Sequence, residues 1–247
     1  MLTSLPGGLL GARHGQPPAR AVALHGWART HLDFDAVLPG VDAVAPDLPG
    51  FGAMAPPATP WGSADYALAA LPLCAEGPPV VLLGHSFGGR VALVLAAEHP
   101  DRVAALVLTA VPLLHPEGTK VPGPSVRHRV ARRLNHLGVI SDRRMEARRQ
   151  RSGSADYQAA RGVMRDVLVR LSGETSDGTY RRALARLRCP VEFVWGEDDR
   201  VTPPAIVAEA TALVPGGPAR VTLIPGVGHL TPTDAPDALQ AALARWL

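Results

Sequence analysis

The chain has 247 residues, 47% of them hydrophobic, and a formal net charge of +3. This length and apolar content fit one large globular domain with a sizeable core and exclude a disordered chain. No apolar run approaches the roughly 18 residues of a transmembrane segment, and the N-terminus lacks the basic start and apolar stretch of a signal peptide.

Short apolar runs recur along the chain, and each is followed by a turn signal. They cover residues 21–24, 41–45, 80–83, 104–108, 191–195 and 221–224. Runs of this length without polar alternation are typical of strands buried on both faces of a parallel sheet. Helix-like stretches lie between several of them, at residues 64–74, 88–99, 203–213 and 235–246. This alternation predicts the α/β class, with a doubly wound and mostly parallel sheet.

Residues 112–188 interrupt this rhythm, because they contain no clear apolar strand. They predict amphipathic helices at 126–137, 142–151 and 157–171. We therefore expect a helical lid inserted into a core formed by residues 1–111 and 189–247. Residues 120–188 hold seventeen Lys and Arg against six Asp and Glu, whereas the rest of the chain holds eight against sixteen. This basic block is either a solvated arginine-rich surface, which is the simpler interpretation, or a binding site for an anionic partner or substrate.

Two further compositional features bear on partners and location. The arginines of the basic block have no interleaved aromatic residues for base stacking, so we expect no nucleic-acid binding. Cys74 and Cys189 lie far apart and form neither a CxxC pair nor a metal-ligand spacing with histidine. We expect reduced thiols, no metal site and a cytoplasmic protein.

The strongest local motif is Gly84-x-Ser86-x-Gly88, which lies between the apolar run 80–83 and the helix-like stretch 88–99. In a nucleophile elbow a serine occupies a sharp strand-to-helix turn, where bulky residues two positions away on either side would clash. The turn also places the hydroxyl at a helix N-terminus, which favours negative charge. A glycine-rich turn with an incidental serine is the alternative. The strand and helix context favours Ser86 as a nucleophile.

A serine hydroxyl needs a base and an acid that orients the base. Of the nine histidines, His229 follows the last predicted strand in a glycine-rich loop, where an open α/β sheet places its site. Asp199 follows the strand 191–195, and Asp198 beside it is the alternative acid. Either aspartate could instead cap the next helix. The order Ser86, Asp199, His229 predicts a catalytic triad with His229 as the general base.

An oxyanion hole needs two N–H donors near the nucleophile. The backbone N–H of Phe87 follows Ser86 directly, and the loop His25-Gly26-Trp27 follows the first predicted parallel strand. We therefore predict the N–H groups of Phe87 and Trp27 as the donors. His25 is a candidate substrate contact, although holding the shape of its loop is its simpler role.

Together these motifs resemble the α/β-hydrolase superfamily over roughly residues 20–110 and 189–247. The resemblance rests on His25-Gly-Trp27, Asp47-Leu-Pro-Gly-Phe-Gly52, Gly84-His-Ser-Phe-Gly-Gly89, Gly196-Glu-Asp-Asp199 and Gly228-His229. It implies a structural Asp47 loop with Phe51 at the rim of the site. Within the superfamily, the first two motifs most resemble pimeloyl-acyl-carrier-protein methyl ester esterases, whose arginine-bearing lid holds an acidic carrier protein. This resemblance implies similar docking by lid arginines such as Arg127 and Arg132, which are also candidate substrate contacts.

The leading functional hypothesis is a serine hydrolase that cleaves a small-molecule carboxylic ester or thioester through an acyl-Ser86 intermediate, without a cofactor. A second hypothesis is cleavage of a C–C or other bond in an anionic substrate whose carboxylates pair with lid arginines. A third is a catalytically silent binding module, because a fold does not determine a function.

Overall fold

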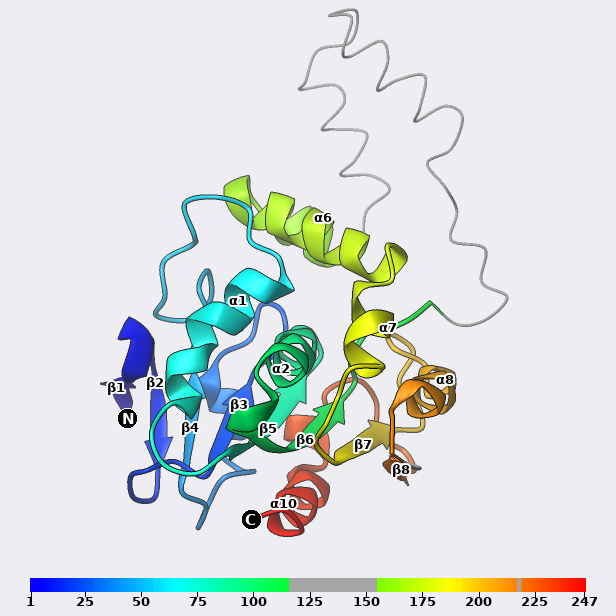
Figure 1. Ribbon diagram of the computed structural model, residues 1–247. Helices are drawn as coiled ribbons and strands as arrows, with labels where there is room; N and C mark the ends of the chain where they lie inside the picture. Colours follow the sequence, from blue (N-terminus) through cyan, green and yellow to red (C-terminus); the bar gives the residue numbers. More distant parts are fainter. Residues whose placement is uncertain (116–154, 217–218) are drawn as a thin grey trace, which may run out of the picture.

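The computed structural model describes residues 1–115, 155–216 and 219–247. In these residues eight strands form one sheet in the order β1-β2-β4-β3-β5-β6-β7-β8 (Figure 1). The pairs β1–β2 and β2–β4 are antiparallel, and the other neighbours are parallel. The strands are β1 (Leu2–Ser4), β2 (Leu10–His14), β3 (Ala21–Leu24), β4 (Ala43–Pro46), β5 (Val80–His85), β6 (Val103–Thr109), β7 (Val191–Gly196) and β8 (Arg220–Ile224).

The described helices follow the alternation expected from the sequence, and the predicted fold class is confirmed. The α-helices are α1 (Ser63–Ala70), α2 (Phe87–Glu98), α5 (Ala155–Ala159), α6 (Gly162–Ser176), α7 (Thr179–Leu184), α8 (Ala205–Leu213), α9 (Thr231–Asp234) and α10 (Pro236–Ala244). Short 3-10 helices are η1 (Pro6–Gly8), η2 (His31–Phe34), η3 (Leu71–Cys74) and η4 (Pro100–Arg102).

Two details differ from the sequence expectations. The antiparallel strands β1 and β2 were not expected, because they are short and carry exposed polar residues. The single helix expected at 157–171 is divided into α5 and α6 near Gly162, whose φ of +52° takes the backbone out of the right-handed helical region. The helices expected at 126–137 and 142–151 lie outside the described residues.

The sheet divides the core into two layers because successive side chains of a strand point to opposite faces. Val22 and Leu24 of β3 face one cluster, which includes side chains from α1, α2, α7 and α8. Ala21 and Ala23 face the other cluster, which contains Leu239 of α10. In Figure 1, α1, α2 and α7 lie on one side of the sheet and α10 on the other. The protein therefore has the layered helix–sheet–helix architecture of the α/β class.

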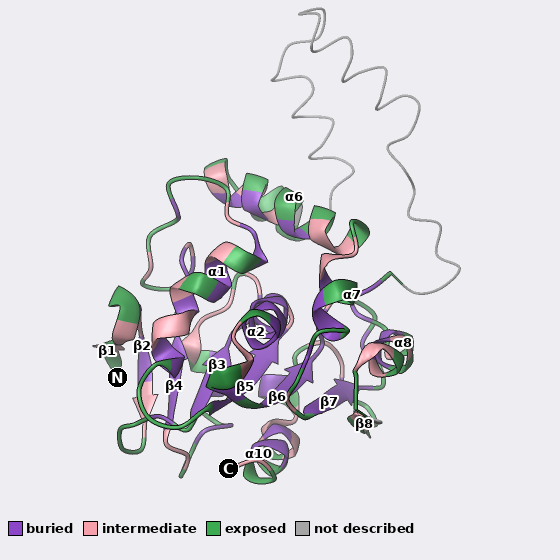
Figure 2. Ribbon diagram, viewed as in Figure 1, coloured by how far each residue is buried: buried purple, intermediate pink, exposed green. Residues whose placement is uncertain are grey.

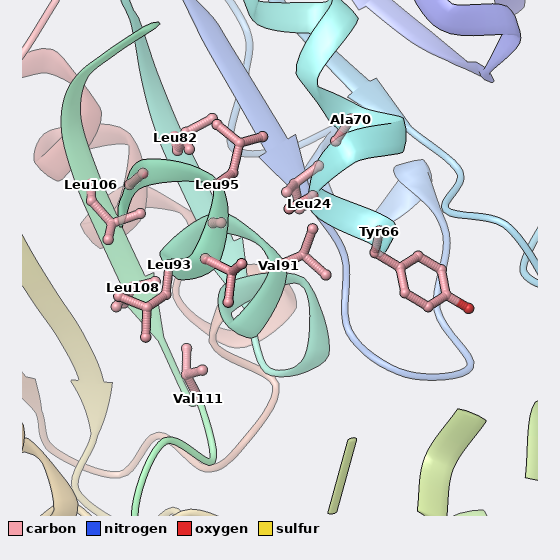
Figure 3. Close-up of a cluster of buried hydrophobic side chains, with 14 of the residues drawn as sticks. Leu24, Tyr66, Ala70, Leu82, Val91, Leu93, Leu95, Leu106, Leu108 and Val111 are labelled. Carbon is pink, nitrogen blue, oxygen red and sulfur yellow. The ribbon is translucent and has the colours of Figure 1, made fainter. Parts of the chain in front are cut away.

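Helix α2 lies at the centre of the first layer, and Figure 2 shows it as buried. All of its residues from Phe87 to Ala97 are buried, which explains why every side chain of this stretch except that of Arg90 is apolar. In Figure 3, Val91, Leu93 and Leu95 lie among leucines of the neighbouring strands, such as Leu106. The start of α2, where the predicted nucleophile lies, is thus held on a rigid part of the core.

Helix α6 lies beyond α1 and α2 and is tied to both (Figure 1). The backbone N–H of Ser63 in α1 donates to the Glu174 carboxylate at 3.1 and 3.2 Å, and the Tyr180 hydroxyl donates to it at 2.8 Å. The buried guanidinium of Arg90 in α2 donates to three groups of the 112–188 segment: the carbonyl oxygens of Pro112 and Leu171 and the hydroxyl of Thr175. Buried polar groups with partners of this kind join α6 firmly to the core.

Among the described residues, no helix is both long enough and apolar enough to cross a membrane.

Candidate active site

The sheet topology brings four loops together at one edge of the sheet. Parallel pairing places Leu24, at the end of β3, opposite Gly84 of β5. In the same way Gly196, at the end of β7, lies opposite Ile224 of β8. The loops that follow β3, β5, β7 and β8 therefore leave the sheet on the same side, where open α/β sheets bind their ligands. The candidate triad residues and the two candidate oxyanion donors lie on these loops or directly after them.

Ser86 lies at the sharp turn between β5 and α2, with φ 50° and ψ −114°. Its two flanking glycines are required by backbone contacts. A Cβ on Gly84 would lie 2.4 Å from the Cα of Gly89, and a Cβ on Gly88 would lie 2.1 Å from the carbonyl oxygen of Leu24. A positive φ at a residue other than glycine is strained, and such strain is typical of functional turns. The geometry is that of a nucleophile elbow.

The side chains of Ser86, His229 and Asp199 form one chain of hydrogen bonds. His229 Nε2 lies 3.1 Å from Ser86 Oγ, and His229 Nδ1 lies 2.9 Å from Asp199 Oδ2. The alternative acid, Asp198, is exposed, and its N–H donates to the carbonyl oxygen of Val227. Of the two neighbouring aspartates, it is therefore Asp199 that faces the imidazole.

Asp199 is 2% exposed, yet both of its carboxylate oxygens are hydrogen-bonded. Oδ1 accepts from the N–H groups of Val201 and Thr202, and Oδ2 accepts from His229 and the Thr202 hydroxyl. Burial raises the pKa of Asp199, but these bonds outweigh it and hold the pKa below its ordinary value. Since a carboxylate only accepts, His229 Nδ1 is the donor, and Nε2 is left to accept from the Ser86 hydroxyl.

Two backbone donors face the same region. Within the described residues, the N–H groups of Trp27 and Phe87 form no hydrogen bond with the protein. Phe87 is the first residue of α2, so its N–H is one of the free donors at the positive end of that helix. The indole of Trp27 packs edge-on against the Phe87 ring, with centroids 5.7 Å apart. Two unpaired donors beside a serine can stabilise a developing oxyanion.

His25 lies in the same loop as Trp27. It is completely buried, its Nδ1 donates to the carbonyl oxygen of Gly26 at 2.7 Å, and its Nε2 accepts from the N–H of Leu48 at 2.9 Å. Burial lowers the pKa of His25, which favours the neutral ring that these bonds require. Nδ1 therefore holds the 25–27 loop itself, and Nε2 joins that loop to the 47–52 loop. The geometry favours the loop-holding role over a substrate contact.

A cavity of about 330 Å³ lies beside Trp27. Phe51 is 9% exposed and packs edge-on against Trp27, with ring centroids 4.9 Å apart. Arg29, a charged residue of the wall, is paired with the Asp33 carboxylate at 2.6–3.1 Å. The lining, mostly apolar, is Trp27, Ala28, Arg29, Thr30, Gly50, Phe51, Gly52, Ala159, Ala160 and Met164. Met164 was not singled out in the sequence, because its spacing in α6 indicates only a core position.

The remaining candidates from the sequence are Asp47 and the two lid arginines. Asp47 accepts from the backbone N–H and Nδ1 of His31 and from the N–H of Ala53, which supports a structural role for its loop. Arg127 and Arg132 lie outside the described residues. Within the described part of the chain, no group of three or more His, Cys, Asp or Glu side chains could hold a metal ion.

His85 contacts the backbone of His229, the candidate base. Its Nε2 donates to the backbone carbonyl oxygen of His229 at 2.9 Å, and its buried Nδ1 has no partner in the described residues. Burial lowers the pKa of His85 to about 4, whereas the pKa of an unfolded histidine is about 6.5. Between these values the unfolded chain binds the proton more readily than the folded protein does. Stability from this group is therefore complete above pH 6.5 and is lost as the pH falls toward 4.

We expect the free energy of unfolding to fall by about 3 kcal/mol from this group between pH 7 and pH 4. Urea unfolding at a series of pH values would measure it. His85→Gln removes the titration and retains an amide donor for the His229 carbonyl, so its profile should be flatter. Parallel profiles for the two proteins would contradict the assignment of the effect to His85.

Family comparison agrees with the fold and the site geometry. Residues 21–242 match the alpha/beta hydrolase family, and the chain belongs to this family. It is 46% identical over 100 residues to the lipase LipV of Mycobacterium tuberculosis, a match that covers 37% of the chain and only 36% of that lipase. It is 30% identical to the pimeloyl-[acyl-carrier protein] methyl ester esterase of Xanthomonas oryzae pv. oryzae, over 94% of the chain and 96% of that protein.

Solved structures extend the fold comparison. The bromoperoxidase of Bacillus anthracis superposes with a TM-score of 0.71, over 100% of the chain and 99% of that structure, at 18% sequence identity. At this identity the likeness concerns the fold. The esterases and the lipase among the sequence relatives support a hydrolase that acts on ester bonds.

Proposed function

We propose that the protein is a serine hydrolase that cleaves a carboxylic ester or thioester through an acyl-Ser86 intermediate. The observation that carries this proposal is the continuous set of hydrogen bonds from Ser86 through His229 to Asp199, beside two unpaired N–H donors. A base in contact with the nucleophile, with its far nitrogen oriented by a buried carboxylate, is the arrangement that activates a serine hydroxyl.

In this mechanism His229 Nε2 takes the proton of Ser86 as Oγ attacks the substrate carbonyl. The resulting oxyanion accepts hydrogen bonds from the N–H groups of Trp27 and Phe87. When the intermediate collapses, His229 gives its proton to the leaving alcohol or thiol, and the acyl group stays on Ser86. A water molecule then attacks the acyl-enzyme, again with His229 as the base, and releases the acid. Asp199 remains ionised and stabilises the imidazolium.

The cavity beside Trp27 would bind an apolar part of the substrate. Its wall is mostly apolar, and the charge of Arg29 is compensated by Asp33. These features favour an uncharged chain or ring over a free carboxylate. Three of the described arginines of the basic block support the same view: Arg170, Arg181 and Arg182 pair with the carboxylates of Asp65, Glu209 and Asp177.

Met164 should set the depth of this cavity. It is 9% exposed, and it packs so closely on Gly50 that a Cβ there would lie 2.4 Å from its Sδ and Cε atoms. We expect Met164→Ala to raise the ratio of kcat/KM for p-nitrophenyl decanoate over butyrate about tenfold, because one or two extra methylenes would find room. Val169→Ala, at an exposed position of the same helix, should leave the ratio unchanged. A ratio unchanged in Met164→Ala would exclude this cavity as the binding site.

The proposal also includes a carrier-protein partner and a cellular location. An acidic carrier protein as the donor of the acyl group is supported by the name of the Xanthomonas relative and by the excess of arginine in residues 120–188. A cytoplasmic location is supported by the two free cysteines, because disulfides form mainly in oxidising compartments. Burial raises the pKa of Cys74 to about 12 and of Cys189 to about 11. Such thiols are unreactive at neutral pH.

The proposal is tested by a substrate panel together with a fluorophosphonate probe. The panel varies acyl length, a terminal carboxylate, and ester against thioester, including acyl groups on an acidic carrier protein. We expect turnover of neutral esters and a covalent adduct on Ser86. Activity confined to dicarboxylic substrates cleaved at a C–C bond would favour the anionic-substrate alternative. Neither turnover nor labelling would indicate a silent binding module and contradict the proposal.

A further inference from the structure

Thr202 contacts the acid of the candidate triad through its hydroxyl. It is 1% exposed and lies in the loop between β7 and α8. Its Oγ1 donates to Asp199 Oδ2 at 2.5 Å, the same oxygen that accepts from His229 Nδ1 at 2.9 Å. The distance from Thr202 Oγ1 to His229 Nδ1 is 3.3 Å. Hydroxyl, carboxylate and imidazole therefore form a triangle of mutual contacts.

The backbone of Thr202 is also held by hydrogen bonds. The indole Nε1–H of Trp195, a fully buried residue of β7, donates to the carbonyl oxygen of Thr202 at 2.8 Å. The N–H of Thr202 donates to Asp199 Oδ1 at 2.9 Å. The carbonyl, the N–H and the hydroxyl of Thr202 are thus all hydrogen-bonded, so the hydroxyl is already oriented toward Asp199. Pre-organisation of this kind is what holds catalytic groups in a productive geometry.

The turn alone does not account for the hydroxyl contact. Asp199 Oδ1 accepts from the N–H groups of Val201 and Thr202, and this pattern closes the turn before α8. A residue without a hydroxyl at position 202 would complete the same turn. The side-chain contact instead falls on Oδ2, the oxygen that faces His229. A carboxylate rotates freely about its last torsion unless both oxygens are held, and here Thr202 holds the second one.

We propose that Thr202 is a positioning residue, whose hydroxyl keeps Asp199 Oδ2 directed at His229 Nδ1 and shares the negative charge of that oxygen. This inference rests on the proposed function, because it assigns Thr202 to the same triad. The hydroxyl does not touch the reacting atoms and acts through Asp199. Among the described residues, His85 is a further titratable group that faces His229, with its ring centroid 5.4 Å away.

Two substitutions separate the hydroxyl from the shape of the side chain. Thr202→Val keeps the branched shape and removes the donor. A hydrogen bond to a charged group contributes about 1.5–3 kcal/mol, so kcat for a p-nitrophenyl ester should fall about 10- to 100-fold. KM should stay within about twofold, because Thr202 contacts no substrate. Thr202→Ser restores the donor, and its kcat should return to within about threefold of the wild-type value.

The pH profile distinguishes positioning from a purely structural role. In Thr202→Val the carboxylate that faces His229 loses one donor and keeps more of its negative charge, which stabilises the imidazolium. The acid limb of the kcat/KM profile should therefore move to higher pH in Thr202→Val and stay in place in Thr202→Ser. Thr211→Val is the matched control, since the Thr211 hydroxyl donates to backbone carbonyl oxygens of α8.

These measurements distinguish failure of the Thr202 proposal from failure of the proposed function. Wild-type protein that shows neither ester turnover nor a fluorophosphonate adduct contradicts the function itself. Active wild-type protein, with Thr202→Val retaining at least half of kcat and an unshifted acid limb, overturns the role of Thr202. If Thr202→Val does not fold, as judged by circular dichroism, Thr202→Ala is measured in its place, and the same criteria decide.

Discussion

Replacement of Ser86 by alanine should lower kcat for a p-nitrophenyl ester by at least about 10⁴-fold. Without Oγ there is no atom to form the acyl-enzyme, and the bond of 3.1 Å to His229 Nε2 is lost. The proposed oxyanion donors, the N–H groups of Trp27 and Phe87, remain, so a small residual rate above the uncatalysed reaction is expected. Because the substitution removes one half-buried hydroxyl, the melting temperature should change little.

Steady-state kinetics and mass spectrometry of fluorophosphonate-treated protein would measure this effect. Ser172→Ala is the matched control, because Ser172 is exposed in α6 and bonds only to the carbonyl oxygen of Leu168. The double variant Ser86→Ala/His229→Ala should be no slower than the Ser86→Ala single variant, since groups that act as a unit are not additive. Turnover that persists in Ser86→Ala would remove this serine from the mechanism.

Gly88→Ala should have the largest effect on folding. A methyl group there would lie 2.1 Å from the carbonyl oxygen of Leu24 and 2.5 Å from that of His25, and both atoms belong to the backbone. Neither side-chain rotation nor a small shift relieves such contacts. Either α2 moves away from β3, which opens the core beneath the nucleophile, or the turn is lost. We expect a destabilisation of at least about 3 kcal/mol, at the upper end of overpacking effects.

Gly173→Ala provides the opposite case within the same protein. Gly173 lies inside α6, and a Cβ built on it meets no atom within 4 Å. Alanine should therefore stabilise the helix by up to about 1 kcal/mol. Thermal unfolding of both variants would show melting temperatures displaced in opposite directions from the wild type. A Gly88→Ala protein as stable as the wild type would mean that α2 and β3 do not approach each other as closely as described.

The parallel strands were predictable because burial on both faces leaves a direct mark on the sequence. Residues 80–83 form an uninterrupted apolar run, residues 191–195 are apolar except for Glu192, and both stretches lie in strands that are buried throughout. The antiparallel strand β2 lacks that mark, since its Arg13 and His14 are partly exposed. The division between α5 and α6 was missed for a different reason. Amphipathic periodicity continues across the break, and only the backbone at Gly162 shows it.

Within the candidate site, what could be predicted was whatever depends on local geometry. The Ser86 turn requires glycines at fixed spacing, so sequence alone locates it. The choice between Asp198 and Asp199 could not be made in the same way, because adjacent carboxylates have the same chemistry and only the turn decides which one points inward. Thr202 and Met164 carry no motif. Their contacts with Asp199 and Gly50 exist only after distant segments have packed.

Arg90 links the 112–188 segment to the helix that follows Ser86. It lies one helical turn after Ser86, and its guanidinium contacts the 112–188 segment near its start, at Pro112, and again at Leu171 and Thr175. The first residue of that segment and its later helix α6 are therefore both bound to α2, the helix that follows the candidate nucleophile. We expect substitutions between these two contact points to leave the position of Ser86 unchanged. A fold built in this way can acquire new substrates without rebuilding its chemistry.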